Sequence, residues 1–379
     1  MSATGISVAV VGLGFGQDFV PIYLAHPDVA RVVLVDPDTA RLSEVGQRFG
    51  ISELYPDVAG VLADPTIDAV HVLAPVHLHA ELSVATLNAG KHCACAVPMA
   101  TSLEDIDKII ATQAVTGKNY MMMETAVYGR EYLTVEELYR QGEIGTLTLY
   151  RGFHIQNLDG YPSYWQGYPP MHYATHALAP ALALLDTTAA SVQCQGAGRL
   201  TPDRTAGNYA NPFPTEVGFF RLAGSDALAD ITMSFFQTAR SYLEGFSLYG
   251  EHIGIEWPPD NEGELLRFDM SAPAAGIRGN TVKSTTMPAR DFPERLPSDL
   301  RKFTKAGTVQ LPGMPAPARI SAHHGGSHPH LVAEFVASIR DGRAPRIDDK
   351  RAAEWTAPGI CAHESALTGG RTVTIPNYS

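Results

Sequence analysis

The sequence predicts an α/β chain of two domains: a doubly wound parallel sheet of Rossmann type, then an α+β domain with a large, mostly antiparallel sheet. Three observations support this. An apolar run ends at once in glycines at residues 12–16, short strands and helices then alternate, and period-two alternation dominates the rest. A chain of 379 residues also exceeds the length at which one core stops growing, roughly 250–300 residues. We therefore expect an NAD-binding Rossmann domain at residues 1–125 and a substrate-binding and oligomerisation domain at residues 126–379.

The first domain begins with the β-branched run at residues 6–11, which is typical of a strand buried on both faces of a parallel sheet. A glycine turn and a helical pattern through Phe19 and Tyr23 follow. Further strands are expected at residues 29–38, 68–75 and 92–97, and helices at 39–49, near 59 and at 79–89. Strands joined by helices in this way predict parallel pairing.

The second domain has a different pattern of apolar and polar residues. After a helix at residues 132–141, alternating segments predict strands at residues 146–156, 216–222, 227–236, 244–257, 263–270 and 369–376. Residues 271–317 are rich in proline, glycine and charge, and we expect a long, partly mobile loop there. Helices at residues 330–341 and 352–368 complete the chain.

Composition excludes several classes of protein. A formal charge of −12 and a pI near 5.6 argue against nucleic-acid binding, which needs a basic face. No window approaches the ~18 apolar residues of a membrane span, and the first apolar run ends in glycines rather than in a cleavage site. The four cysteines are too scattered for a disulfide framework, so we expect buried thiols and a cytoplasmic protein.

The glycine cluster lies where a phosphate loop belongs. Gly12 allows the tight turn and Gly14 allows the backbone to approach a pyrophosphate, while the third glycine appears one position early, as Gly16. Asp36 ends the second strand, where a carboxylate bonds a ribose 2′-hydroxyl and repels a 2′-phosphate, so we predict NAD rather than NADP. The alternative is a plain βα turn with Asp36 as a helix cap.

A second cluster lies at residues 164–180, after two prolines. If residues 171–185 are helical, His172 and His176 lie one turn apart on one face. Two such histidines can bind zinc, but Tyr173 stands where H-E-x-x-H has its glutamate, so no metal is expected. Tyr173 and His176 instead provide a phenol and an imidazole for proton transfer to a sugar. The alternative is that these side chains are simply satisfied at a domain interface.

Two further stretches carry candidate residues. In residues 123–131, Glu124 and Tyr128 could reach the nicotinamide end of a cofactor, although Glu124 could equally cap a helix. Residues 322–330 bring four histidines around Gly325 and Gly326, which indicates either a backbone that curls close to a ligand or a solvated histidine-rich loop.

Taken together, Gly12-x-Gly14, Asp36, the stretch at residues 74–92 and the region of Pro98 resemble the glucose–fructose oxidoreductase / inositol dehydrogenase (Gfo/Idh/MocA) superfamily over nearly the whole chain. In members of this superfamily, the triplet that ends at this proline usually reads Glu-Lys-Pro, and the lysine assists hydroxyl deprotonation during hydride transfer. Here the triplet is Ala96-Val97-Pro98, so the usual acid–base group is missing.

NAD-dependent glycosidases of glycoside hydrolase family 109 also lack this lysine. Their Tyr-Pro-Thr-His-Gly-Leu-Gly-Pro, Glu-Asn-x-x-Tyr-Gly-Arg-Glu and Gly-His-Gly-Gly stretches are similar to residues 173–180, 124–131 and 323–326 here. Thr125 and Ala174 depart from those patterns, so the sugar may differ from N-acetylgalactosamine. A sulfoquinovoside, as used by related sulfoquinovosidases, is the favoured guess, with Arg130, Arg151 and Arg240 available as anion partners.

The resemblance implies a redox-neutral cycle: oxidation of the sugar at C3, removal of the C2 proton, elimination at C1, addition of water and reduction at C3. In this cycle Tyr173 is the C2 base, His176 polarises the C3 oxygen and Tyr128 assists at the leaving group, and the roles of Tyr173 and His176 could be exchanged. Three alternatives stay open: a sugar or cyclitol dehydrogenase with His176 as base, a 3-keto-glycoside lyase, and a non-enzymatic NAD sensor.

The expected site residues are then as follows. Cofactor residues are Gly12, Gly14, Phe15, Gly16, Asp36, Pro75, His79, Val97, Pro98 and Glu124. Catalytic residues are Tyr173, His176, Tyr128 and His172, and substrate residues are Trp165, Thr175, His154 and His324. The expected partner is a small carbohydrate glycoside, without nucleic acid or membrane, and the resemblance implies a homodimer or homotetramer.

Overall fold

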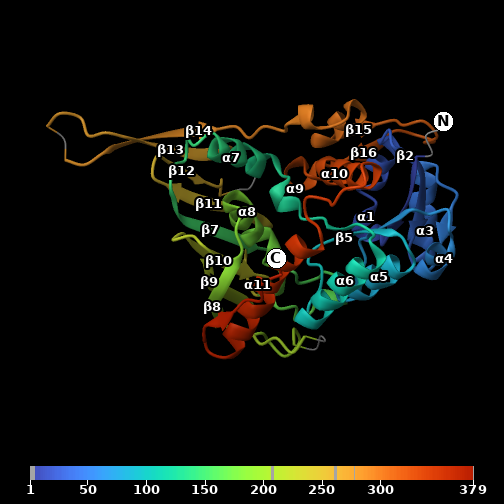
Figure 1. Cartoon of the computed structure of the whole chain (residues 1–379), viewed down its shortest axis with the longest axis horizontal. Coiled ribbons are helices and arrows are strands. Elements are labelled where there is room, and N and C mark those ends of the chain that lie inside the picture. Colours follow the sequence, from blue (N-terminus) through green and yellow to red (C-terminus); the bar gives the residue numbers. More distant parts are fainter. Residues whose placement is uncertain (1–4, 206–208, 260–262, 277, 379) are drawn as a thin grey trace. The chain divides into compact units, whose positions relative to one another are not determined.

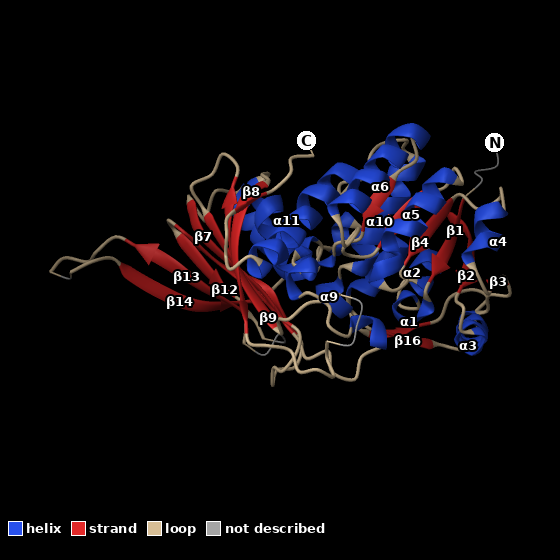
Figure 2. Ribbon diagram, turned by 90° about the horizontal axis from the view of Figure 1, so that it is seen from below, coloured by secondary structure: helices blue, strands red, loops and turns tan. Residues whose placement is uncertain are grey.

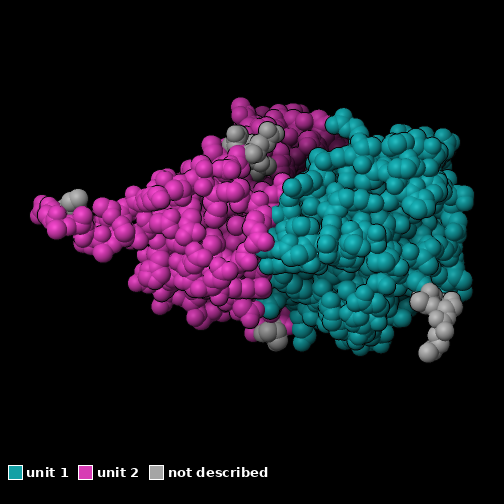
Figure 3. All heavy atoms as spheres, turned by 90° about the horizontal axis from the view of Figure 1, so that it is seen from above, with its two compact units in different colours: residues 1–129, 291–353 teal, residues 130–290, 354–379 magenta. Residues whose placement is uncertain are grey.

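The structure is a computed structural model that describes residues 5–205, 209–259, 263–276 and 278–378. Contacts divide the chain into two units (Figure 3): unit 1 contains residues 1–129 and 291–353, and unit 2 contains residues 130–290 and 354–379. Residues 291–353 therefore group with the N-terminal part of the chain, whereas sequence patterns alone place them in the second domain. Periodicity identifies a helix but does not say which sheet it packs on.

Unit 1 is built on a six-stranded parallel sheet in the order β3-β2-β1-β4-β5-β6. Figure 1 labels β2 and β5 of this sheet, and Figure 2 labels β1, β2, β3 and β4. The strands of the sheet are β1 (Ile6–Val11), β2 (Val29–Val35), β3 (Leu54–Tyr55), β4 (Ala69–Val72), β5 (His92–Cys95) and β6 (Tyr120–Met122). This is the strand order of the dinucleotide-binding fold, in which ligands bind at the carboxyl ends of the strands where the order reverses, beside β1 and β4. The predicted Rossmann architecture is confirmed.

The helices of unit 1 come from both of its chain segments. The first segment supplies α1 (Leu13–Gly16), α2 (Val20–Ala25), α3 (Thr39–Phe49), α4 (Val58–Ala63), η1 (Val76–Leu78), α5 (His79–Asn88), α6 (Leu103–Thr116) and η2 (Thr125–Val127). The second supplies η5 (Pro293–Arg295), η6 (Ser298–Thr304), the hairpin β15 (Gly307–Val309) and β16 (Ala318–Ile320), α9 (His323–Gly326) and α10 (His328–Arg340). The helix expected through Phe19 and Tyr23 is interrupted, because Pro21 starts a new helix in α2.

The two segments of unit 1 are joined by hydrogen bonds at the edge strand β6. The backbone N–H of Met122 donates to the carbonyl of Ile347 over 3.1 Å. Just before β6, the side-chain amide of Asn119 donates to Ser338 Oγ over 3.0 Å and to the carbonyl of Arg343 over 2.8 Å. Residues 291–353 are thus hydrogen-bonded to the edge of the sheet, although all six of its strands come from residues 6–122.

Unit 2 contains a nine-stranded sheet in the order β14-β13-β12-β11-β7-β10-β9-β8-β17 (Figure 2). Its strands are β7 (Leu147–Ile155), β8 (Ala189–Ala197), β9 (Thr215–Leu222), β10 (Leu228–Ser234), β11 (Leu243–Gly250), β12 (Ile253–Glu256), β13 (Leu265–Ser271), β14 (Thr281–Met287) and β17 (Val373–Thr374). Only β7 and β10 pair in parallel among these described strands, so the mostly antiparallel sheet is confirmed.

The remaining elements of unit 2 are α7 (Arg130–Arg140), η3 (Ser163–Trp165), η4 (Pro170–Tyr173) and α8 (Thr175–Leu185), together with most of α11 (Asp349–Leu367), through which the division between units passes. Helix α8 packs closely on one face of the sheet. Tyr150 Oη donates to the carbonyl of Ala177 over 2.8 Å, and a Cβ on Gly152 would lie 2.0 Å from that same oxygen. Glycine at position 152 is therefore what lets the helix approach β7.

Residues 271–317, expected to be a long excursion or a partly mobile loop, contain regular elements. Strand β14 lies within this segment and pairs along its whole length with β13, and η5, η6 and β15 follow. The residues of β14, TVKSTTM, are exposed or half-buried throughout, so this strand lacks the apolar alternation by which strands are recognised. Strand β8 was also not expected, because only Val192 and Cys194 give its buried face an apolar character.

Candidate active site

The glycine turn after β1 has the geometry of a phosphate loop. Gly12 has a φ of 90°, and a Cβ there would lie 2.6 Å from the carbonyl oxygen of Leu73. A Cβ on Gly14 would meet nothing within 4 Å, so the space above this residue is open. Gly16 packs closely, with Leu73 and Val10 each 3.1 Å from its virtual Cβ. The three glycines thus provide a turn, an approach for a ligand and tight packing of α1 on the sheet, as a dinucleotide requires.

Asp36 fixes the position of this turn from the end of β2. Its carboxylate is buried and accepts the backbone N–H of Leu13 over 2.7 Å and that of Asp38 over 2.9 Å. Helix α3 is capped by Asp38 instead, which accepts from Ala40 and Arg41, so Asp36 is not the helix cap. An acidic group at this strand tip, next to an open glycine turn, fits the adenosine ribose of NAD.

His79 joins the loops that follow β4 and β5. Its Nδ1 lies 2.7 Å from the carbonyl oxygen of Pro98 and its Nε2 lies 2.9 Å from that of Ala74. Both oxygens only accept, so two good hydrogen bonds require a protonated ring. Burial lowers the pKa of His79, but the Cys95 side chain and the two carbonyls outweigh it and raise the pKa to about 9. The expected cofactor residues Pro75 and Val97 lie in the same two loops.

Position 97 offers no proton-transfer group. Val97 is only 5% exposed and precedes a cis peptide bond to Pro98. The described residues of this loop, Ala96-Val97-Pro98, carry no amine. Any acid or base that acts on the substrate must therefore come from elsewhere in the chain.

Glu124 and Tyr128 follow β6 in unit 1, and both are buried. Glu124 accepts the backbone N–H of Ala126 over 2.9 Å at the start of η2, which is the capping role left open above. Tyr128 ends η2, and the guanidinium carbon of Arg346 lies 5.6 Å from the centre of its ring. A role for either residue toward a cofactor or leaving group stays a prediction.

His324 lies beside the glycine turn. Its ring packs edge-on against that of Phe15, with centroids 6.1 Å apart, and Phe15 is 39% exposed. The backbone is left-handed at His324, with a φ of 49°, and also at Gly325 and Gly326. The expected tight curl of these residues is present, and it places His324 in unit 1, next to the phosphate loop.

Unit 2 brings four of the predicted residues into one aromatic cluster. Tyr173 from η4 and His176 from α8 have ring centroids 4.8 Å apart, and His154 from β7 lies 5.8 Å from each. Trp165 packs edge-on against Tyr173 at 5.4 Å. Phe235 closes the cluster beside His154 and Tyr173, at 5.1 Å and 5.9 Å. The cluster combines apolar walls with a phenol and two imidazoles, a combination typical of small-molecule sites.

Sequence reasoning did not identify the acid of this cluster, Glu244 on β11. It accepts a hydrogen bond from Tyr242 Oη, and its two oxygens lie 3.7 Å from His154 Nδ1 and 4.0 Å from His176 Nδ1. The signal was present in the sequence, since Glu244 has the same strand parity as Phe246 and Leu248, both of which are buried. A glutamate on the apolar side of an alternating strand is a candidate functional residue.

His172 does not join the cluster. Residues 170–173 form the 3₁₀ helix η4, and α8 begins only at Thr175, so the expected one-turn relation between His172 and His176 is wrong. The His172 ring instead faces His363, 5.1 Å away, and burial, followed by that neighbour, lowers its pKa to about 3. The Thr175 hydroxyl is buried at the start of α8 without a hydrogen-bond partner among the described residues.

The segment that carries Tyr173 is held by Glu216 on β9. This fully buried carboxylate accepts the backbone N–H of Met171 over 2.8 Å through one oxygen, and its other oxygen lies 2.7 Å from His363 Nδ1. η4 is thus anchored to the sheet two residues before Tyr173. The anchoring explains how a short segment after two prolines holds a defined position.

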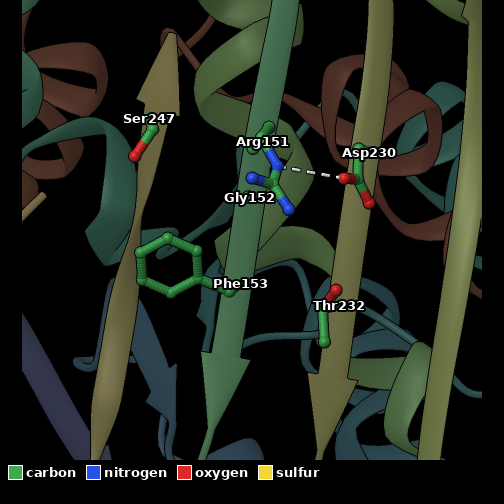
Figure 4. A pocket seen from close by; sticks show the side chains of 6 residues that line it. All are labelled: Arg151, Gly152, Phe153, Asp230, Thr232 and Ser247. Carbon is green, nitrogen blue, oxygen red and sulfur yellow. Dashed lines mark hydrogen bonds and ion pairs between the residues drawn. The ribbon is translucent and has the colours of Figure 1, made fainter. Parts of the chain in front are cut away.

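A pocket of about 190 Å³ opens on the opposite face of the sheet, because Arg151 and Phe153 alternate with His154 along β7. Figure 4 shows its lining, in which Arg151 pairs with Asp230 over 3.1 Å. The volume is below the ~300 Å³ of typical ligand sites, and the aromatic cluster faces the other way. This pocket is not the candidate active site.

The described residues contain no group of three or more His, Cys, Asp or Glu side chains arranged to hold a metal ion. No described helix has the length and apolar character needed to cross a bilayer. All four cysteines are buried free thiols, as expected.

Comparison with known proteins supports the predicted family. Residues 6–124 match the oxidoreductase family with an NAD-binding Rossmann fold, GFO_IDH_MocA. The match supports the predicted Gfo/Idh/MocA resemblance, the predicted NAD-dependent enzyme and the predicted NAD cofactor.

Curated relatives point to a subgroup. The chain is 24% identical to a glycosyl hydrolase family 109 protein of Streptomyces niveus, over 99% of this chain and 77% of that protein. It is also 24% identical to an alpha-N-acetylgalactosaminidase of Shewanella oneidensis, over 83% of this chain and 70% of that protein. The suspected family 109-like subgroup is thereby supported.

Solved structures agree on the fold. The chain is similar to a levoglucosan dehydrogenase in complex with NADH and L-sorbose, with a TM-score of 0.77, 18% identity, and coverage of 98% of this chain and 99% of that one. A myo-inositol 2-dehydrogenase of Lactobacillus plantarum gives a TM-score of 0.71 at 15% identity, covering 98% and 100% of the two chains.

Proposed function

We propose that the protein is an NAD-dependent glycoside hydrolase that cleaves a hexoside through transient oxidation at C3, elimination across C1 and C2, addition of water and reduction at C3. One observation carries the proposal: the loop at residues 96–98 has Val97 where dehydrogenases of the family have lysine, while unit 2 holds Tyr173 and His176 in ring contact at 4.8 Å. The similarity to family 109 glycosidases supports it.

The residues of the cluster divide the proton transfers between them. His176 takes the proton of the C3 hydroxyl and later returns it, in place of the absent lysine. The phenolate of Tyr173 takes the C2 proton, which the C3 ketone has made acidic, and becomes a phenol as the C1–O bond to the leaving group breaks. Bound NAD supplies the hydride acceptor and, after reduction, the hydride donor, so no net oxidation results. No oxocarbenium ion forms, and the usual pair of glycosidase carboxylates is unnecessary.

An uncharged hexoside suits this cluster better than the sulfoquinovoside favoured by resemblance. Glu244 places a carboxylate among the imidazoles, and it would repel a sulfonate held nearby. Arg151 points to the opposite sheet face and pairs with Asp230, while Arg240 donates to Ser241 Oγ over 2.8 Å. Neutral p-nitrophenyl hexosides should therefore be cleaved faster than p-nitrophenyl sulfoquinovoside by the same enzyme.

The decisive experiment is cleavage of a panel of p-nitrophenyl hexosides in D₂O, with and without added NAD⁺. We expect the sugar product to carry deuterium at C2 and NADH absorbance at 340 nm not to accumulate. Product without deuterium at C2 would exclude elimination. Steady accumulation of NADH with free sugar would instead establish a dehydrogenase, for which His176 is the base, and release of an unsaturated 3-keto sugar would establish a lyase.

The Tyr173→Phe enzyme should lose cleavage by roughly 10²-fold or more, the usual contribution of a general base, and retain NADH binding. Tyr249→Phe is the matched control, because this tyrosine pairs with Glu256 on the neighbouring strand, outside the cluster. Equal activity of the Tyr173→Phe and wild-type enzymes would mean that another residue removes the C2 proton.

A further inference from the structure

Glu244 lies on β11 directly opposite His154 on β7, as the strand register shows. Residues opposite each other on paired strands point to the same face of a sheet, and His154 is buried on the face that α8 covers. The Glu244 side chain is accordingly only 10% exposed. It is an acid on the apolar side of the sheet, next to the segment that begins α8.

The Glu244 carboxylate contacts three aromatic side chains from three parts of unit 2. Tyr242 Oη donates to Oε2, His154 Nδ1 lies 3.7 Å from Oε2, and His176 Nδ1 lies 4.0 Å from Oε1. The other ring nitrogen of His154, Nε2, lies 3.1 Å from Gln156 Oε1. Each carboxylate oxygen therefore faces one imidazole, and His176 turns its Nδ1 toward Glu244.

Burying a carboxylate is unfavourable unless hydrogen bonds and an opposite charge compensate for it. Among the described contacts, the titratable groups next to His176 include Tyr173 from η4, His154 from β7 and Glu244 from β11, and Tyr242, just before β11, bonds to Glu244. Of these groups, Glu244 is the acid. A carboxylate beside an imidazole stabilises the imidazolium and fixes which ring nitrogen carries the proton, as in hydrolases that pair an acid with a histidine base.

We propose that Glu244 is the positioning residue that orients His176 with a proton on Nδ1, so that Nε2 accepts the proton of the sugar's C3 hydroxyl. This inference rests on the function proposed above. As the C3–H hydride leaves with its electron pair to NAD⁺, the C3–O bond becomes a carbonyl and the hydroxyl proton passes to Nε2. The imidazolium, held against Glu244, gives the proton back to the C3 oxygen when hydride returns. The pair thus supplies the acid–base function that Val97 lacks.

The Glu244→Gln holoenzyme tests the proposal, with Glu256→Gln as its control. Glu256 also accepts a tyrosine hydroxyl in the same sheet, that of Tyr249 over 2.8 Å, but contacts no histidine of the cluster. We expect Glu244→Gln to lower kcat/KM for glycoside cleavage by roughly 10²-fold, with the acidic limb of the pH profile moved to lower pH because the imidazolium is less stable. NADH affinity and Tm should stay close to wild type, Glu244→Asp should recover part of the activity, and Glu256→Gln should behave as wild type.

A second measurement uses the wild-type holoenzyme and needs no variant to fold. With ¹⁵N-labelled histidine, long-range ¹H–¹⁵N NMR spectra identify the tautomer of each ring. His176 should carry its proton on Nδ1 above its titration midpoint, and the Nε2–H tautomer there would overturn the proposal. So would a Glu244→Gln enzyme with unchanged kcat/KM and pH profile.

The glycosidase assignment can be wrong while the role proposed for Glu244 is right. If the wild-type enzyme oxidises free sugars and cleaves no glycoside, the glycosidase assignment is wrong. In that case the same pH profiles, measured on sugar oxidation, test the role of Glu244. An unshifted acidic limb in Glu244→Gln would then overturn the role of Glu244, and a limb moved to lower pH would support it.

Discussion

At the scale of single residues, His79 makes stability depend on pH. Its pKa of about 9 in the folded chain is above the ~6.5 of an unperturbed histidine, because Cys95, Pro98 and Ala74 together outweigh the effect of burial. The charged ring therefore contributes stability that is fully present below about pH 6.5 and is lost as pH rises through about 9. A difference of this size corresponds to about 3 kcal/mol.

The measurement is urea unfolding of wild type and His79→Gln at pH 6 and at pH 9.5. Glutamine can bond one loop carbonyl but carries no charge, so the wild type should be more stable at pH 6 and the gap should shrink at pH 9.5. A gap that is the same at both values would show that the His79 ring is neutral in the folded chain.

Gly12 and Gly14 differ in what a methyl group would do. Gly12→Ala combines a φ of 90° with a contact of 2.6 Å to a backbone oxygen, so it should cost about 1–3 kcal/mol and abolish NAD binding. Gly14→Ala meets no protein atom within 4 Å, so Tm should be unchanged while NADH affinity falls. Thermal unfolding and NADH fluorescence titration distinguish the two. If the Gly14→Ala protein bound NADH as tightly as wild type, the cofactor phosphates would not lie in the space above Gly14.

At the scale of elements, the contact between α8 and β7 positions the side chains proposed as catalytic, His176 among them. Gly152→Ala would place a Cβ 2.0 Å from the carbonyl oxygen of Ala177, so α8 must shift. We expect a loss of about 1–3 kcal/mol in stability, as for overpacked cores, together with loss of glycoside cleavage and retention of NADH binding in unit 1. Gly307→Ala in β15, which meets nothing within 4 Å, is the control. Full activity of Gly152→Ala would show that the position of α8 tolerates change.

The same scale shows how far the sequence alone could go. The parallel sheet of unit 1 was predictable because its strands are buried on both faces, and α3 was predicted at its observed bounds, Thr39–Phe49. Strand β14 was not predictable, since it is held by backbone pairing with β13 and not by an apolar face. Tyr173, His176 and His154 could be selected by residue type. Strand parity could have marked Glu244 as an acid on the apolar side of its strand, but its place opposite His154 needed the register of β11 on β7, a contact between residues 90 positions apart.

At the scale of the whole molecule, association of subunits stays a prediction. Arg151, Phe219 and their neighbours point away from the face that α8 covers, and Phe219 is 48% exposed. We expect this face to pair with its copy in a homodimer or homotetramer. Light scattering after gel filtration should give a smaller mass for Phe219→Glu than for wild type. Val115→Glu, at an 85% exposed position on α6, is the control, and equal masses for all three proteins would place the interface elsewhere.

The two-segment composition of unit 1 has a consequence for biogenesis. The ribosome completes residues 1–129 early, yet the edge strand β6 receives its hydrogen-bond acceptor, the carbonyl of Ile347, only after all of residues 130–290 have been synthesised. Unit 1 of the nascent polypeptide therefore lacks this hydrogen bond for more than half of the translation time. NAD can stabilise it fully only near the end of synthesis, when residues 130–290 of unit 2 have already emerged.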